Sequence, residues 1–126
     1  MSGAIDRAKL ARLNLDLDLR RAALRASGDL CNDARDQHDT MRAQLLRDLS
    51  RHAAGLWDEQ RQSVADLLAL SADDLRQCRV DIPLARQCIA ALDRMNELRR
   101  RHDALAAELD PLSRLVANLN VYVLEH

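Results

Sequence analysis

The fold is decided by residues 88–123, CIAALDRMNELRRRHDALAAELDPLSRLVANLNVYV. Here apolar residues recur at alternating intervals of three and four, which places them along one face of an α-helix. We call this set the C-terminal seam: Cys88, Ala91, Met95, Leu98, His102, Leu105, Leu109, Leu112, Val116, Leu119 and Val123. The residues between them are mostly charged. The pattern therefore predicts a long helix that buries one face against another helix.

A second set with the same spacing, the N-terminal seam, lies in the first half of the chain. Its weakest point is Ser27-Gly28-Asp29, where glycine can end one helix and aspartate can cap the next. One continuous helix with a soft spot is the alternative. The members of this seam are Leu10, Leu13, Leu17, Arg20, Leu24, Ser27, Cys31, Ala34, His38, Met41 and Leu45.

Capping and breaking residues predict where the helices end. Gly55, the capping sequence from Ser71 to Asp74, and Asp81-Ile82-Pro83 each indicate a break. Asp110-Pro111 fits an N-cap followed by proline, so we expect a kink or a short break there. The predicted helices are residues 4–27, 29–54, 57–79, 83–109 and 111–123. We therefore predict an all-α fold, an elongated antiparallel hairpin or bundle of four to five helices with coiled-coil-like heptad packing.

Length and composition agree with one helical domain. The 126 residues include only 2% aromatics, three glycines and two prolines, so few breaks are available. We assign residues 1–123 to a single domain and interpret residues 124–126, Leu-Glu-His, as the start of a purification tag. Arginine greatly exceeds lysine, which is typical of a GC-rich genome and leads us to expect a bacterial source.

Charge and cysteine usage exclude several classes of protein. Nineteen basic and twenty acidic residues give a net charge of -1, so nucleic-acid binding is not expected. The apolar runs are too short for the roughly 20 residues of a membrane span. Three cysteines at wide spacings do not form a secreted disulfide framework. We therefore expect a soluble, cytoplasmic protein without a membrane partner.

Two histidines, His38 and His102, lie on the seams. A histidine on a buried face can titrate near neutral pH or bind a metal. A metal site would also need Cys31 or Cys88, but the four residues have no recognised ligand spacing. We predict that the histidines are polar seam residues that fix helix register or act as switches. No metal and no cofactor are predicted.

One short motif suggests an enzyme. Residues 47–52, Arg-Asp-Leu-Ser-Arg-His, resemble the arginine, four intervening residues and histidine of the HEPN family, which comprises all-α ribonucleases that often act as toxins. The resemblance covers six residues. It implies RNA cleavage in a dimeric cleft, with Arg47 and His52 as the catalytic residues.

The seams favour a different function, protein–protein interaction or assembly. Their apolar faces exceed what one small bundle can bury, so dimerisation or binding of a partner helix would complete the core. We expect an adaptor, chaperone or regulatory subunit that forms a homodimer or higher oligomer, or binds another protein, with no enzymatic activity. The expected binding residues are Leu98, Leu105, Leu109, Leu112, Val116 and Leu119.

Overall fold

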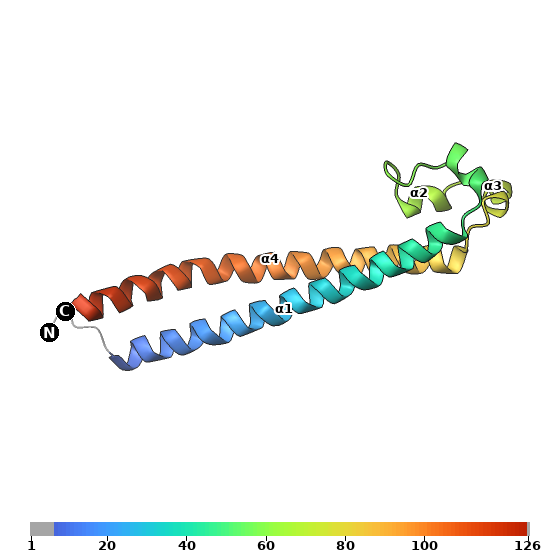
Figure 1. Cartoon of the computed structure of the whole chain (residues 1–126). Helices are drawn as coiled ribbons and strands as arrows, with labels where there is room; N and C mark the ends of the chain where they lie inside the picture. The colour runs from blue at the N-terminus through green and yellow to red at the C-terminus, as the bar shows by residue number, and fades with distance from the viewer. Residues whose placement is uncertain (1–6, 126) are drawn as a thin grey trace. The chain divides into compact units, whose positions relative to one another are not determined.

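The protein is all-α, as the sequence predicts. The computed structural model describes residues 7–125, and no strand occurs among them. Two long helices, α1 (Arg7–Asp48) and α4 (Ile82–Glu125), enclose three short elements in the sequence (Figure 1). The short elements are the 3-10 helix η1 (Arg51–Gly55) and the α-helices α2 (Val64–Leu68) and α3 (Ala72–Gln77). The predicted start of the first helix, at residue 4, lies outside the described residues.

The predicted helix boundaries at Gly28 and at Pro111 are wrong, while the alternative of a kink at Pro111 stays a prediction. Helix α1 runs through Gly28 for 42 residues, and α4 runs through Pro111 for 44 residues. The alternative of one continuous N-terminal helix is therefore correct. Good helix formers on both sides of each breaker outweigh its local cost, since the long amphipathic face gains more by staying continuous.

Residues 29–48 are helical as predicted, but the predicted helix end at residue 54 and the single helix at 57–79 are wrong, because tertiary hydrogen bonds redirect the chain after α1. After α1 ends at Asp48, the Ser50 amide donates to the Cys78 carbonyl at 2.9 Å, and the Ser50 hydroxyl donates to the Gln77 carbonyl at 2.8 Å. Both acceptors lie at the C-terminal end of α3, where carbonyls lack helical partners. Ser50 thus donates hydrogen bonds to the last carbonyls of α3, and its amide cannot continue the helix of α1.

Trp57 organises the irregular segment that precedes α2. Its side chain is 5% exposed, and its indole Nε1–H donates to the Ser63 carbonyl at 2.8 Å. A buried indole needs such an acceptor. The ring belongs to a core cluster with five other buried residues: Leu45, Val64, Leu67, Ala85 and Cys88. The segment therefore wraps around the tryptophan instead of forming a helix.

The breaks indicated at Ser71 and Asp81 are confirmed, since α3 and α4 begin directly after these residues. The Ser71 hydroxyl accepts from the Asp74 amide at 3.2 Å, and an Asp81 carboxylate oxygen accepts from the Leu84 amide at 3.1 Å. Helix α2 has a full capping box between Ser63 and Asp66. At the end of α3, Arg79 adopts a left-handed conformation with φ 57°, where glycine is the usual residue. These caps fix the starts of α2, α3 and α4 and the end of α3.

The chain divides into two compact units. Unit 1 comprises residues 1–31 and 98–126, and unit 2 comprises residues 32–97. Unit 1 is a pair of helical segments, whereas unit 2 contains the short elements and the Trp57 core. The prediction that residues 1–123 form a single domain stays a prediction.

Candidate interaction surface

Within unit 1, α1 and α4 run antiparallel. The Asn14 side-chain amide donates to the Asn120 side-chain oxygen at 3.4 Å, and Arg21 Nη2 donates to Ser113 Oγ at 3.4 Å. Residue numbers therefore increase along α1 in the direction in which they decrease along α4. The two helices of unit 1 therefore pack side by side in opposite directions.

The seam positions lie on the covered faces of their helices. Every C-terminal seam residue is buried or half-buried, and the same holds for the N-terminal seam except Arg20. Of the predicted binding residues, Val116 is 1% exposed and the other five, Leu98, Leu105, Leu109, Leu112 and Leu119, are half-buried. Helix α1 thus takes up part of the apolar surface that the sequence offers for binding.

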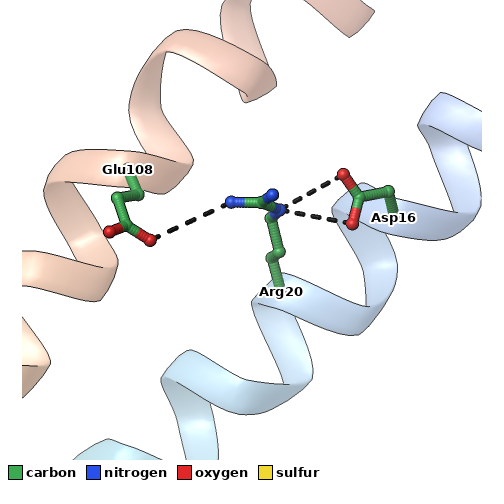
Figure 2. A network of polar contacts seen from close by, with 3 residues as sticks. All are labelled: Asp16, Arg20 and Glu108. Carbon is green, nitrogen blue, oxygen red and sulfur yellow. Dashed lines mark hydrogen bonds and ion pairs between the residues drawn. The ribbon is translucent and has the colours of Figure 1, made fainter.

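Arg20 departs from the seam because it joins a polar network at the edge of unit 1 (Figure 2). Its Nε lies 3.2 Å from both carboxylate oxygens of Asp16, and its Nη1 lies 4.0 Å from Glu108 Oε2 on α4. All three side chains are substantially exposed, so the network contributes little to stability. It marks the rim of the helix pair.

The outer face of unit 1 carries large apolar side chains in contact with water. Leu15 and Leu19 on α1 are 60% and 61% exposed, and Leu115 on α4 is 48% exposed. Of the eight large hydrophobic residues exposed in the described part of the chain, seven belong to unit 1 and only Leu56 to unit 2. The complete unit 1 set is Leu15, Leu19, Leu30, Leu115, Val121, Tyr122 and Leu124.

Gly28 serves as a small residue opposite a histidine, not as a helix end. A methyl group built on Gly28 would lie 3.5 Å from His102 Cε1, which is ordinary van der Waals contact. The imidazole therefore packs against the α1 backbone. His102 Nδ1 is buried and has no hydrogen-bond partner among the described residues. The structure thus places His102 on the covered face, and its predicted role as a switch stays a prediction.

This geometry predicts that Gly28→Ala stabilises unit 1 by about 1 kcal/mol. The substitution removes the helix penalty of glycine, and the available space accepts the methyl group. Thermal unfolding followed by circular dichroism measures the change. Ala23→Gly, an exposed position five residues earlier, should produce a loss of similar size. A lower stability of Gly28→Ala would show that the contact with His102 is too tight.

His38, the second seam histidine, belongs to unit 2. Its side chain is 12% exposed, and its Nδ1 lies 3.1 Å from Asp39 Oδ1. The adjacent carboxylate gives the ring a local polar partner on the half-buried face of α1. Within residues 7–125, no three histidine, cysteine or acidic side chains gather where they could hold a metal ion.

Arg47 and His52, the residues of the HEPN resemblance, are both exposed. Arg47 lies in the last turn of α1, where a cation interacts favourably with the helix dipole. His52 follows in η1, after the chain has left α1. A hollow of about 430 Å³ opens in this part of unit 2, and its lining includes Arg51 and Trp57 but neither motif residue. Arg47 and His52 therefore lie beside this hollow without lining it, although Leu49, Ser50 and Arg51 between them do line it.

Two of the three free cysteines lie in the core of unit 2. Burial raises the pKa of the Cys78 thiol, and Asp74 raises it further. Burial also raises the pKa of the Cys88 thiol, with Arg42 acting in the opposite direction. Both thiols therefore stay neutral above the ordinary thiol value of 9.0.

These raised pKa values predict that unit 2 loses stability in alkali. Unfolding exposes the thiols, which then ionise near pH 9.0, so the unfolded state binds fewer protons than the folded state. The stabilisation is fully present below that pH and is lost as the pH rises through the folded pKa values. Denaturant unfolding followed by Trp57 fluorescence between pH 8 and 10 measures the slope. Cys88→Ala should flatten it, whereas an unchanged slope would contradict the assignment.

Comparison with models of known protein families, with curated proteins and with solved structures found no match. No helix within residues 7–125 combines the length and apolarity needed to cross a membrane.

Proposed function

We propose that the protein is a helical protein–protein interaction and assembly module, with unit 1 as its binding part. The observation that carries the proposal is the concentration of exposed leucines on unit 1. Large apolar side chains gathered on one part of a surface are typical of a binding site. Each leucine gains about 1.5–3 kcal/mol when it is fully buried.

The distribution of buried residues supports the same proposal. Among the twelve buried hydrophobic residues of the described chain, only Leu10, Leu17 and Val116 belong to unit 1. Unit 2 has its own core around Trp57. In an isolated pair of helices, only one side of each helix is covered. Unit 1 is therefore the part that would bury the most additional apolar surface if further helices packed against it.

The proposed packing is an antiparallel coiled coil that associates into a larger bundle. In unit 1 the seam positions other than Arg20 are buried or half-buried, and half-buried leucines such as Leu105 and Leu112 keep part of their surface exposed. An added helix beside the pair would cover this surface and the outer leucines together. This role suits an adaptor, chaperone or regulatory subunit and needs no cofactor.

Concentration-dependent association tests the proposal. Sedimentation velocity should show a mass above that of the monomer, and the melting temperature should rise with protein concentration. The double variant Leu15→Glu with Leu19→Glu should lose this association while keeping its helical circular dichroism. Leu56→Glu, at the exposed leucine of unit 2, is the matched control and should leave it intact. A monomer at every concentration, with no protein cross-linked to it in the expressing cell, would contradict the proposal.

The same preparation distinguishes the ribonuclease alternative. Arg47 and His52 belong to unit 2, so the surface variants of unit 1 leave them untouched. We expect RNA incubated with the pure protein to stay intact. RNA cleavage that disappears in His52→Ala would replace the assembly proposal with the HEPN-like one.

A further inference from the structure

The outer face of α1 carries a regular stripe of alanine and leucine. The stripe lies within unit 1, and its six residues are all exposed: Ala11, Leu15, Leu19, Ala22, Ala26 and Leu30. Their spacings are four, four, three, four and four residues, which read the same in both directions. At 3.6 residues per turn they span about 100° of the helix surface, on the side opposite the seam. We call this set the outer stripe.

The side chains of the outer stripe are complementary in size to those of a second copy that runs in the opposite direction. Read forward it is Ala-Leu-Leu-Ala-Ala-Leu, and read backward it is Leu-Ala-Ala-Leu-Leu-Ala. If two copies of the stripe meet antiparallel, position 11 faces position 30, position 15 faces 26, and position 19 faces 22. Every leucine then meets an alanine. Facing large and small residues interdigitate well and keep the spacing between the helices constant.

Charges beside the outer stripe fit the same pairing. Asp18 and Arg25 lie on one flank of it, and a two-fold antiparallel arrangement brings like flanks together. With position 19 facing 22, Asp18 of one copy and Arg25 of the other differ by two residues in height. This offset is about 3 Å at 1.5 Å per residue. The symmetry repeats the opposite-charge pair on the other side of the axis.

We infer that the occupant of this surface is a second copy of the chain, which binds antiparallel along the outer stripe with the two-fold axis between residues 20 and 21. A parallel pair in register would place leucine against leucine and alanine against alanine, giving uneven layers. The inference rests on the proposed assembly function and names its partner.

A size swap tests the pairing without changing charge or helix propensity strongly. Ala22→Leu should weaken the dimer by about tenfold or more, because the new leucine meets Leu19 of the other copy. Leu19→Ala should also weaken it, since alanine then meets alanine. The double variant Leu19→Ala with Ala22→Leu restores one leucine against one alanine and should recover the wild-type dissociation constant. Sedimentation equilibrium measures all four proteins, and circular dichroism confirms that each stays helical.

Disulfide formation tests the orientation in a Cys31→Ser background. Mixing Leu19→Cys protein with Ala22→Cys protein should give a cross-linked dimer under mild oxidation, whereas Leu19→Cys alone should not. Efficient linkage of Leu19→Cys to itself would indicate a parallel dimer and overturn the inference. An Ala22→Leu variant that dimerises more tightly would overturn it too, since any nonspecific apolar patch would gain from the larger side chain.

The results separate this inference from the proposed function. If the wild-type protein associates but the swap variants do not follow the predicted order, the antiparallel pairing is wrong and assembly through another surface stands. If the wild-type protein is monomeric at every concentration, the second copy is excluded as the occupant.

Discussion

Leu45→Ala is expected to destabilise unit 2 by about 2–5 kcal/mol, because the leucine is 0% exposed and its loss leaves a cavity. Leu45 joins α1 to the rest of the core cluster, which includes Trp57 and Leu67. Trp57 is the only tryptophan, so its fluorescence reports directly on this core. Urea unfolding followed by that signal gives the change.

Gln44→Ala is the matched control for Leu45→Ala. It lies at the preceding position of the same helix and is exposed, so its effect should stay within about 0.5 kcal/mol. Similar losses in the two variants would contradict the placement of Leu45 at the centre of the core.

Pro111→Ala is expected to stabilise unit 1 by up to about 3 kcal/mol, the usual cost of proline inside a helix. Proline has no amide hydrogen to donate to the Ala107 carbonyl, and its ring crowds that carbonyl. Both residues are exposed, so water can reach the carbonyl and α4 tolerates the defect. Thermal unfolding by circular dichroism measures the gain, and amide exchange around residue 111 should slow.

Pro83→Ala provides the comparison for Pro111→Ala. Pro83 lies in the first turn of α4, where amides have no helical acceptor, so proline costs little there. This variant should be neutral or slightly less stable, since alanine is more flexible than proline in the unfolded chain. Equal gains in stability from both substitutions would show that the effect of Pro111→Ala does not come from its position in the helix interior.

The seams were predictable because helical periodicity repeats over many residues. From Leu10 to Leu45 and from Cys88 to Val123, nearly every predicted seam position lies on a covered face. The helix boundaries predicted at Gly28 and Pro111 were wrong because the long apolar face around each residue outweighs its local breaking effect. Gly28 in addition leaves space for the His102 ring on α4, a contact that the sequence does not reveal.

The segment between the long helices was not predictable from local signals. Residues 57–79 have helical composition, but Trp57 and Ser50 hold the chain through hydrogen bonds to residues 6 and 28 positions away. Such bonds depend on the tertiary fold. Serine caps at positions 63 and 71 were the only local indications that this stretch begins helices afresh.

The candidate surface was predicted only in part. The prediction concentrated on the seam, for example Leu105 and Leu109, and missed the outer leucines Leu15 and Leu19. A signal for them existed: alanine and leucine recur at helical spacing on the face of α1 opposite the seam. A second apolar stripe on an otherwise charged helix indicates a second neighbour.

Ser50 gives the connection between α1 and η1 an unusual amide. Its N–H is bonded to the Cys78 carbonyl, although Ser50 itself belongs to no helix. Exchange of that hydrogen with solvent deuterium requires this hydrogen bond to break, so that the segment at Ser50 separates from the C-terminal end of α3. The Ser50 amide should therefore exchange at the slow rate of core helices, while the neighbouring Arg51 amide exchanges much faster, and their ratio would report the opening of unit 2.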